Sequence, residues 1–155
     1  MERRLSLKHT RTSWIVKLRP DLAPHVEQDP LGHGLILVPT PLLVAGEIRR
    51  IRRGRLTTPT AIRRRLAERF HADRTCPLTT GIFLNIIAGA AEEQLGAGKR
   101  PVAPWWRVVE ENGGLNPKRP PSLERQALHL RSEGHRVTRS PGGTWRVGRT
   151  GKEPG

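Results

Sequence analysis

The chain has 155 residues, enough for one domain with a modest core and tails. Its 28 Lys and Arg residues outnumber its 14 Asp and Glu residues, which gives a formal charge of +14 and favours binding to a polyanion such as nucleic acid. Contact with a ribosome, an acidic protein partner or a need for solubility are the alternative explanations of such a charge. The chain has a single cysteine, Cys76, which excludes an intramolecular disulfide and a zinc site built from several thiolates. No apolar run reaches the roughly 20 residues that span a bilayer. We therefore expect a cytoplasmic protein.

Residues 1–33 mix basic, acidic and proline residues with isolated apolar side chains and show no sustained period, which predicts a basic N-terminal arm. A short helix is expected at residues 13–18, with Thr12 or Ser13 as its cap and Pro20 as its stop. Trp14 is expected to dock the arm on the domain, and a disordered basic tail is the alternative.

Residues 35–38 predict a short strand or extended entry, and the apolar spacing of residues 42–51 then predicts a helix that ends before Gly54. A second helix is expected from Pro59, capped by Thr57 or Thr58. A third runs from Pro77 to about residue 95. Its wide apolar stripe predicts that it is largely buried, and the stripe contains Ile82, Phe83, Ile86, Ile87, Ala90 and Ala91.

The rest of the chain alternates short elements with turns. Residues 102–109 are rich in Val and Trp and predict a strand, followed by a turn at residues 112–114. Ser122 caps a final helix that ends at Gly134. Residues 136–148 predict a hairpin and residues 149–155 a disordered tail. The fold class is therefore mainly α within α+β, with the central domain at residues 34–135.

The second and third helices, joined by a turn that contains Asp73, are typical of a helix-turn-helix, whose later helix enters the major groove of DNA through its N-terminal residues. Free N–H groups, hydroxyls and close backbone approach would bind phosphate there, at Thr79, Thr80, Gly81 and Asn85. Further phosphate contacts are expected from Arg55, Arg63, Arg64, Lys99 and Arg100, with Arg52 and Arg53 beside them. The alternatives are that the threonines only cap the helix and that the basic residues are ordinary solvated charges.

The stretch Pro104-Trp105-Trp106-Arg107-Val108-Val109 resembles the Pro-Cys-His-Arg-Val active-site motif of DNA-repair alkyltransferases. Residues 51–57 are similar to the family's Ile-Pro-x-Gly-x-Val-x-Thr, and Gly113-Gly114-Leu115 and a Glu-Gly pair at 133–134 follow in the family's order, so the resemblance spans roughly residues 41–134. It implies a winged-helix-like alkyltransferase DNA-binding domain. The sequence also resembles the non-enzymatic alkyltransferase-like branch of this family, in which a Trp replaces the cysteine and alkylated guanine is bound without repair.

This sequence departs from the enzymes where the chemistry would occur. Trp105 stands at the acceptor cysteine, Trp106 at the histidine, and Ala127 near the position expected for a carboxylate, so covalent transfer is not expected there. The resemblance implies a base pocket made by Trp105, Trp106, Arg107 and Thr58, in which one indole faces the core and the other the pocket. Gly81 stands where the family has an Arg that fills the gap left by a flipped base, and Thr58 where it has a Tyr.

Together these observations predict a non-catalytic DNA-binding protein on an alkyltransferase scaffold. The more specific prediction is that it senses alkylated guanine for repair. We expect a monomer associated with the nucleoid, with duplex DNA and a repair protein as partners, no cofactor and no metal, because the six histidines do not cluster at ligand spacing. Two alternatives stay open. One is a cysteine alkyltransferase whose Cys76 thiol reaches the Trp105 pocket, and the other is a protein-interaction module whose basic charge is incidental.

Overall fold

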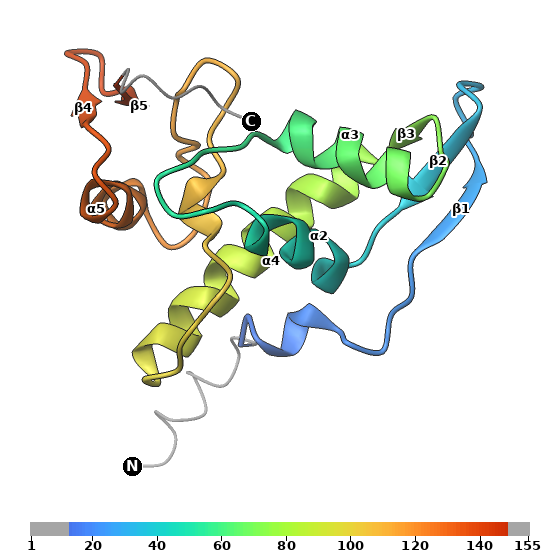
Figure 1. Cartoon of the computed structure of the whole chain (residues 1–155), viewed down its shortest axis with the longest axis horizontal. Helices are drawn as coiled ribbons and strands as arrows, with labels where there is room; N and C mark the ends of the chain where they lie inside the picture. The colour runs from blue at the N-terminus through green and yellow to red at the C-terminus, as the bar shows by residue number, and fades with distance from the viewer. Residues whose placement is uncertain (1–12, 149–155) are drawn as a thin grey trace, which may run out of the picture.

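The computed structural model describes residues 13–148, which form an α+β fold, as predicted (Figure 1). Within that range there are four α-helices: α2 (Pro41–Arg49), α3 (Pro59–Arg69), α4 (Pro77–Gly96) and α5 (Leu123–Ser132). Three of them begin at side-chain caps, because the hydroxyls of Thr40, Thr58 and Ser122 each accept a hydrogen bond from the backbone N–H three residues later. The caps at Thr58 and Ser122 were predicted, and the cap at Thr40 was not. None of these helices combines the length and apolar character needed to cross a bilayer.

A small three-stranded sheet joins the N-terminal segment to the domain. Strand β1 (His25–Gln28) pairs antiparallel with β2 (Leu35–Val38), and β2 pairs parallel with β3 (Arg74–Thr75), which leads from α3 into α4. Strand β1 lies inside the predicted arm, so the sheet crosses the boundary expected at residue 33. The four exposed residues of β1 carry no apolar alternation, which explains why the sequence pattern did not indicate a strand.

The described part of the arm also contacts α4 through Trp14. An added Cβ at Gly89 would lie 2.3 Å from the Trp14 ring, so the indole lies directly on the helix backbone. The carboxylate of Glu93 accepts hydrogen bonds from the Ser13 hydroxyl and from the N–H groups of Trp14 and Ile15. Docking through Trp14 is thus confirmed, whereas the helix expected at residues 13–18 shrinks to a 3-10 turn, η1 (Val16–Leu18).

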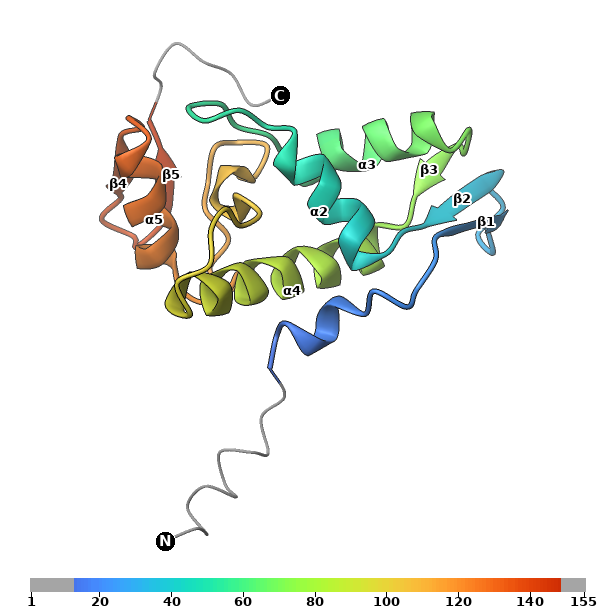
Figure 2. The same ribbon diagram turned by 60° about the horizontal axis from the view of Figure 1, so that its bottom comes forward.

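Helix α4 runs through the centre of the molecule, beneath α2 and α3 in Figure 2. Leu84, Ile87, Ala88 and Ala91 of its buried side meet Val44, Ile48, Ile62 and Leu66 from α2 and α3 in the main core. A smaller core lies under α5 and the C-terminal hairpin, and Leu56, Val109, Leu115, Ala127, Leu130, Val137 and Val147 form it. Ile82 was expected in the buried stripe but is 48% exposed, because it lies on the outer side of α4, whereas Thr80 and Leu84 of the same turns are buried.

The strand expected at residues 102–109 is not formed. Trp105–Arg107 is instead a 3-10 turn, η2, and Val108 contributes only an isolated bridge to Thr57. The indole N–H of Trp105 donates to Glu92 on α4, and that of Trp106 donates to Glu133 at the C-cap of α5. These long-range hydrogen bonds outweigh the β propensity of residues 102–109. The expected C-terminal hairpin is confirmed as β4 (Val137–Arg139) paired antiparallel with β5 (Trp145–Val147). The predicted tail at residues 149–155 lies outside the described range.

Candidate nucleic-acid interface

The first half of α4 presents an open, uncharged face. Leu78 is 72% exposed and Ile82 is 48% exposed, although both are large apolar side chains. Gly81 lies between them, and a Cβ added there would meet nothing within 4 Å. Helix α3 and the short strand β3 precede this face in the order expected of a helix-turn-helix. A partner surface can therefore approach the α4 backbone closely at Gly81.

The two threonines of this turn differ from each other. Thr80 is fully buried, and its hydroxyl donates to the backbone carbonyl of Cys76 at 2.7 Å, so its predicted phosphate contact is wrong. Thr79 is half-buried and lies 3.4 Å from the same carbonyl. For Thr80 the capping alternative holds, because a buried hydroxyl is satisfied inside the protein rather than by a ligand.

A shallow cavity of about 400 Å³ adjoins the open face. It lies between the start of α3, the first half of α4 and the loop before α5, and its lining comprises Pro59, Pro77, Leu78, Gly81, Ile82, Leu84, Asn85, Glu110, Asn116, Lys118 and Arg119. We call it the α4 cavity. It brings Gly81 and Asn85, two of the predicted contact residues, to one place.

Arg119 forms the polar floor of the α4 cavity. Only 5% of the residue is exposed, and its guanidinium donates to the side-chain carbonyl of Asn85 at 2.8 Å. Burial lowers the pKa of Arg119, while the carboxylate of Glu110, 3.9 Å away, opposes that shift. A buried guanidinium beside an amide offers several donors in a fixed orientation. The sequence did not single out Arg119, which stands in a proline-rich stretch with no motif around it.

The predicted phosphate-binding residues do not gather on one surface. Arg63 and Arg64 lie on α3, where Arg63 donates to the Thr60 hydroxyl at 3.2 Å and Arg64 is exposed. Arg55 lines a different hollow with Arg50, Arg52, Arg53 and Arg65. Lys99 and Arg100 follow the C-terminal end of α4, at the opposite end of that helix from Gly81. Only the α3 arginines belong to the helix-turn-helix itself.

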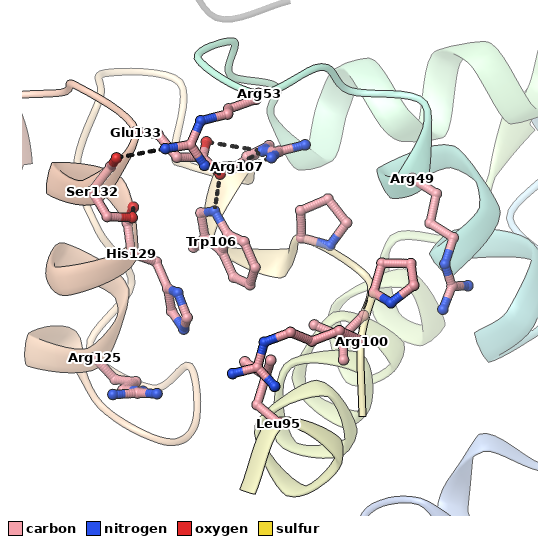
Figure 3. A pocket seen from close by; sticks show the side chains of 13 residues that line it. Arg49, Arg53, Leu95, Arg100, Trp106, Arg107, Arg125, His129, Ser132 and Glu133 are labelled. Atoms are coloured by element: carbon pink, nitrogen blue, oxygen red, sulfur yellow. Dashed lines mark hydrogen bonds and ion pairs between the residues drawn. The ribbon is translucent and has the colours of Figure 1, made fainter. Parts of the chain in front are cut away.

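A larger cavity of about 680 Å³ lies beside Trp106 at the C-terminal end of α4 (Figure 3). We call it the Trp106 cavity, and its lining comprises Arg49, Arg53, Leu95, Arg100, Pro101, Val102, Pro104, Trp106, Arg107, Arg125, His129, Ser132 and Glu133. Trp106 stacks on His129 with ring centroids 3.9 Å apart and an interplanar angle of 12°. Two members of the predicted base pocket, Trp106 and Arg107, thus line one cavity.

The other two members of the predicted base pocket, Trp105 and Thr58, do not line the Trp106 cavity. Trp105 is 1% exposed and packs in the main core, so the buried indole cannot wall a pocket in this structure. Thr58 is 4% exposed, and its hydroxyl caps α3 by accepting from the N–H of Ala61. The expectation that one indole faces the core and the other a cavity is met by Trp105 and Trp106 respectively.

Glu133 supplies the carboxylate that was expected to be missing. Arg107 donates to it through Nε and Nη2, and the indole of Trp106 donates at 2.8 Å. Burial raises the pKa of Glu133, but these hydrogen bonds outweigh burial and hold the pKa below its ordinary value. Ala127, the position expected to lack a carboxylate, is instead fully buried in the smaller core. The Glu-Gly pair at 133–134 was the sequence signal that could have found Glu133.

Glu92 of α4 plays the same part for the other indole. It accepts from Trp105 at 3.0 Å, from Arg125 at 2.7 Å, and it lies 2.7 Å from Nε2 of His129. Burial raises its pKa, and the three donors lower it to a net value below the ordinary one. Burial also lowers the pKa of His129 despite the adjacent carboxylate, which favours a neutral imidazole at neutral pH.

Cys76 lies at the N-terminal cap of α4, and neither the α4 cavity nor the Trp106 cavity includes it among its lining residues. Burial raises the pKa of its thiol, and hydrogen bonds from Thr79 and from backbone N–H groups bring the pKa below its ordinary value. Trp105, which the enzyme alternative places next to this thiol, contacts Glu92, Trp106 and His129 instead. Within residues 13–148, no group of three or more His, Cys, Asp or Glu side chains is arranged to hold a metal ion.

No protein-family profile matches the chain, and no curated protein sequence matches it. Two solved structures are similar to it. One is S. pombe Atl1 in complex with damaged DNA containing O6-carboxymethylguanine, with 19% identity, 73% of this chain and 92% of that chain covered, and a TM-score of 0.48. The other is S. pombe ATL in complex with DNA, with 18% identity, the same coverage and a TM-score of 0.47.

Proposed function

We propose that this protein binds duplex DNA through the first half of α4 and performs no covalent chemistry on it. The open face at Leu78, Gly81 and Ile82 is the observation that carries this proposal, because large apolar side chains stay exposed there around a glycine that permits close approach. A helix with such an end, preceded by α3 and a short connection, has the form that enters a major groove.

The electrostatics of the helix-turn-helix favour DNA. The N-terminus of α4, a helix of 20 residues, directs free N–H groups and the positive end of the helix dipole outward. Helix α3, which carries Arg63 and Arg64, contacts the segment just before α4, because the Thr75 hydroxyl donates to the backbone carbonyl of Arg63 at 2.8 Å. Lys118 lines the α4 cavity. The acidic residues of α4, Glu92 and Glu93, lie near the other end of the helix and already bind partners within the chain. Nothing acidic on α4 therefore repels a phosphate backbone at its first turns.

The α4 cavity suits an extrahelical base, which moves the proposed base pocket away from Trp105 and Thr58. Its volume of about 400 Å³ lies within the range of small-molecule sites, roughly 300 to 1,000 Å³. Arg119 can donate to the acceptors that guanine presents at O6 and N7. Leu78 or Ile82 can enter the base stack and occupy the gap, as apolar wedges do in other DNA-bending proteins. Alkylated guanine is the proposed lesion, since an alkyl group on O6 removes no acceptor and adds apolar surface.

Binding without transfer follows from the residues beside both cavities. Trp105 and Trp106 each donate an indole N–H to a carboxylate and offer no nucleophile. Alkyl transfer requires an activated thiolate within reach of the alkylated base. Cys76 lies at the start of α4 without lining the α4 cavity.

Fluorescence anisotropy with matched duplexes, one of which carries an O6-alkylguanine, tests this proposal at two salt concentrations. We expect tighter binding of the alkylated duplex and an unchanged intact mass after prolonged incubation. Ile82→Ala should reduce the preference for the alkylated duplex. Leu128→Ala on α5, another exposed leucine outside both cavities, is the matched control and should not.

Each contrary result has a distinct meaning. Equal binding of the two duplexes would reduce the protein to a general DNA binder and remove the lesion from the proposal. A mass gain of one alkyl group would establish the enzyme alternative with Cys76 as the acceptor. If neither duplex binds, the result would favour the interaction-module alternative, and the exposed apolar pair Leu78 and Ile82 would be its candidate docking surface.

A further inference from the structure

We infer that the Trp106 cavity is a second ligand site, which binds a nucleotide by holding its phosphate with Arg49 and Arg100 and its base against an apolar wall. The proposed DNA contact does not use this cavity, and the two cavities share no lining residue. The inference therefore goes beyond the proposed function and does not depend on it.

Unbalanced positive charge is the first observation behind this site. Five arginines line the cavity, and they come from α2, the loop after α2, the segment before η2, η2 itself and α5. Only one carboxylate, Glu133, lines it with them. Glu133 is already bound to Arg107 and Trp106, and Glu92 holds Arg125 from behind. Within the described residues, the guanidinium groups of Arg49 and Arg100 have no hydrogen bond or ion pair to any group of the chain. Figure 3 shows these two side chains on different sides of the opening, with Arg125 opposite Arg49.

The kind of cation narrows the ligand to a phosphate. All the basic side chains of the cavity apart from His129 are arginines, and none is a lysine. A guanidinium is a planar fork that binds two oxygens of a phosphate at once, with charge-assisted hydrogen bonds. Two such forks without internal partners, on separate elements, match the several oxygens of one phosphate group or of a phosphate chain.

The rest of the lining indicates a base attached to that phosphate. Leu95, Pro101, Val102 and Pro104 form an apolar wall next to the half-buried Trp106. His129 stacks behind the indole and fixes its orientation. The volume of about 680 Å³ lies within the usual range for small-molecule sites, roughly 300 to 1,000 Å³. A bare inorganic anion would leave this wall in water, whereas a nucleotide covers it and binds the arginines together.

The position of the cavity separates it from the proposed DNA contact. Leu95 lines the Trp106 cavity and Asn85 lines the α4 cavity, and these ten residues of helix correspond to about 15 Å along the axis. A duplex seated on the first turns of α4 would leave the Trp106 cavity open. The nucleotide can be free in solution or be the end of a nucleic-acid strand, since the same groups would recognise both.

Calorimetric titration of the full chain with ATP, AMP, adenosine and pyrophosphate tests the site. We expect ATP and AMP to bind, and adenosine and pyrophosphate each to bind at least about tenfold more weakly, because each lacks one half of the ligand. Competition for bound ATP by oligonucleotides with a 5′-phosphate, but not by the same strands with a 5′-hydroxyl, would identify strand ends as a source. Failure of both would assign the site to free nucleotides.

The double variant R49Q/R100Q should weaken ATP binding at least about tenfold. The matched double R136Q/R139Q removes the same charge at exposed arginines outside the cavity and should change ATP affinity by no more than about twofold. Three results would each overturn the inference: equal weakening of ATP binding in the two double variants, pyrophosphate binding as tight as ATP binding, or no nucleotide binding at all. Anisotropy of R49Q/R100Q with duplex DNA keeps the two proposals distinct, because loss of nucleotide binding with control-like DNA affinity affects this site alone.

Discussion

The two halves of α4 have opposite relations to the rest of the chain. The last turns carry Glu92 and Glu93, and each carboxylate holds a different segment in place: Glu92 binds Trp105, Arg125 and His129, and Glu93 binds the backbone around Trp14. The first turns carry no charge and keep Leu78, Gly81 and Ile82 uncovered. One helix thus organises the fold with its acidic end and leaves its apolar end free for a partner.

This difference separates stability from binding within a single element. The two carboxylates of α4, Glu92 and Glu93, are distant from the open face and engaged inside the protein. Changes in the last turns should therefore affect unfolding more than DNA affinity, and changes in the first turns the reverse. The predictions below use that contrast, beginning with the largest effect.

Glu92→Gln should lower the free energy of unfolding by about 3 kcal/mol, because it removes the charge that three side chains share at a mostly buried site. Duplex affinity should stay unchanged. Chemical denaturation and anisotropy measure the two quantities. Glu124→Gln on the exposed side of α5 is the control, expected within about 0.5 kcal/mol of the parent. Comparable losses in both variants would show that Glu92 does not hold the last turns together.

Trp14→Ala should lower the free energy of unfolding by about 2 kcal/mol, because it removes a half-buried indole from the surface of α4. A double-mutant cycle sharpens the test. Gly89→Ala should destabilise the parent, because its Cβ would lie 2.3 Å from the Trp14 ring, but should be neutral or stabilising by up to about 1 kcal/mol once Trp14 is Ala. Additive effects of the two substitutions would remove Trp14 from α4 in solution.

Replacing Arg63 and Arg64 by Ala should weaken binding to all duplexes alike and lower the slope of log affinity against log salt by about 2, close to one unit per lost phosphate contact. Titrations at several salt concentrations give the slope. R136A/R139A removes the same charge at two exposed arginines near the C-terminal hairpin and serves as the control. An unchanged slope would leave α3 outside the interface.

A smaller effect is expected from His129. Because its pKa in the folded protein is lowered, the unfolded chain takes up the proton first, so stability is greatest above the unfolded pKa of about 6.5 and decreases as the pH falls below that value. His129→Gln should reduce this loss, measured as the midpoint of urea unfolding between pH 7 and 5. His33→Gln, at an exposed site, is the control. If both variants keep the parent profile, His129 does not titrate in this way.

Much of the fold was predictable because local chemistry decides it. Thr58 and Ser122 stand before apolar spacings of helical period, so the starts of α3 and α5 follow from the sequence alone. The 3-10 turn at Trp105–Arg107 did not follow, because the two indoles adopt it to reach Glu92 and Glu133, which lie 13 and 27 residues away along the chain. Local propensity carries no information about such partners.

The candidate site was predictable only in part. The spacing of α3 and α4 indicated that Gly81 and Asn85 belong together at a contact surface, and both line the α4 cavity. The burial of Thr80 depends on how α4 packs. The position of Arg119 in the α4 cavity depends on the path of a loop without regular structure. The Trp106 cavity gathers arginines from four separate parts of the chain, which no local pattern brings together.

The most direct measurement is a duplex titration of Gly81→Glu beside Gly46→Glu. Both glycines are exposed in helices, an added Cβ would meet nothing within 4 Å at either one, and both substitutions add one carboxylate. We predict that Gly81→Glu binds duplex DNA at least about tenfold more weakly than Gly46→Glu, because it puts a negative charge against the phosphates at the first turns of α4, while the two variants unfold at similar denaturant concentrations. Equal affinity of the two variants would contradict the assignment of DNA binding to this end of the helix.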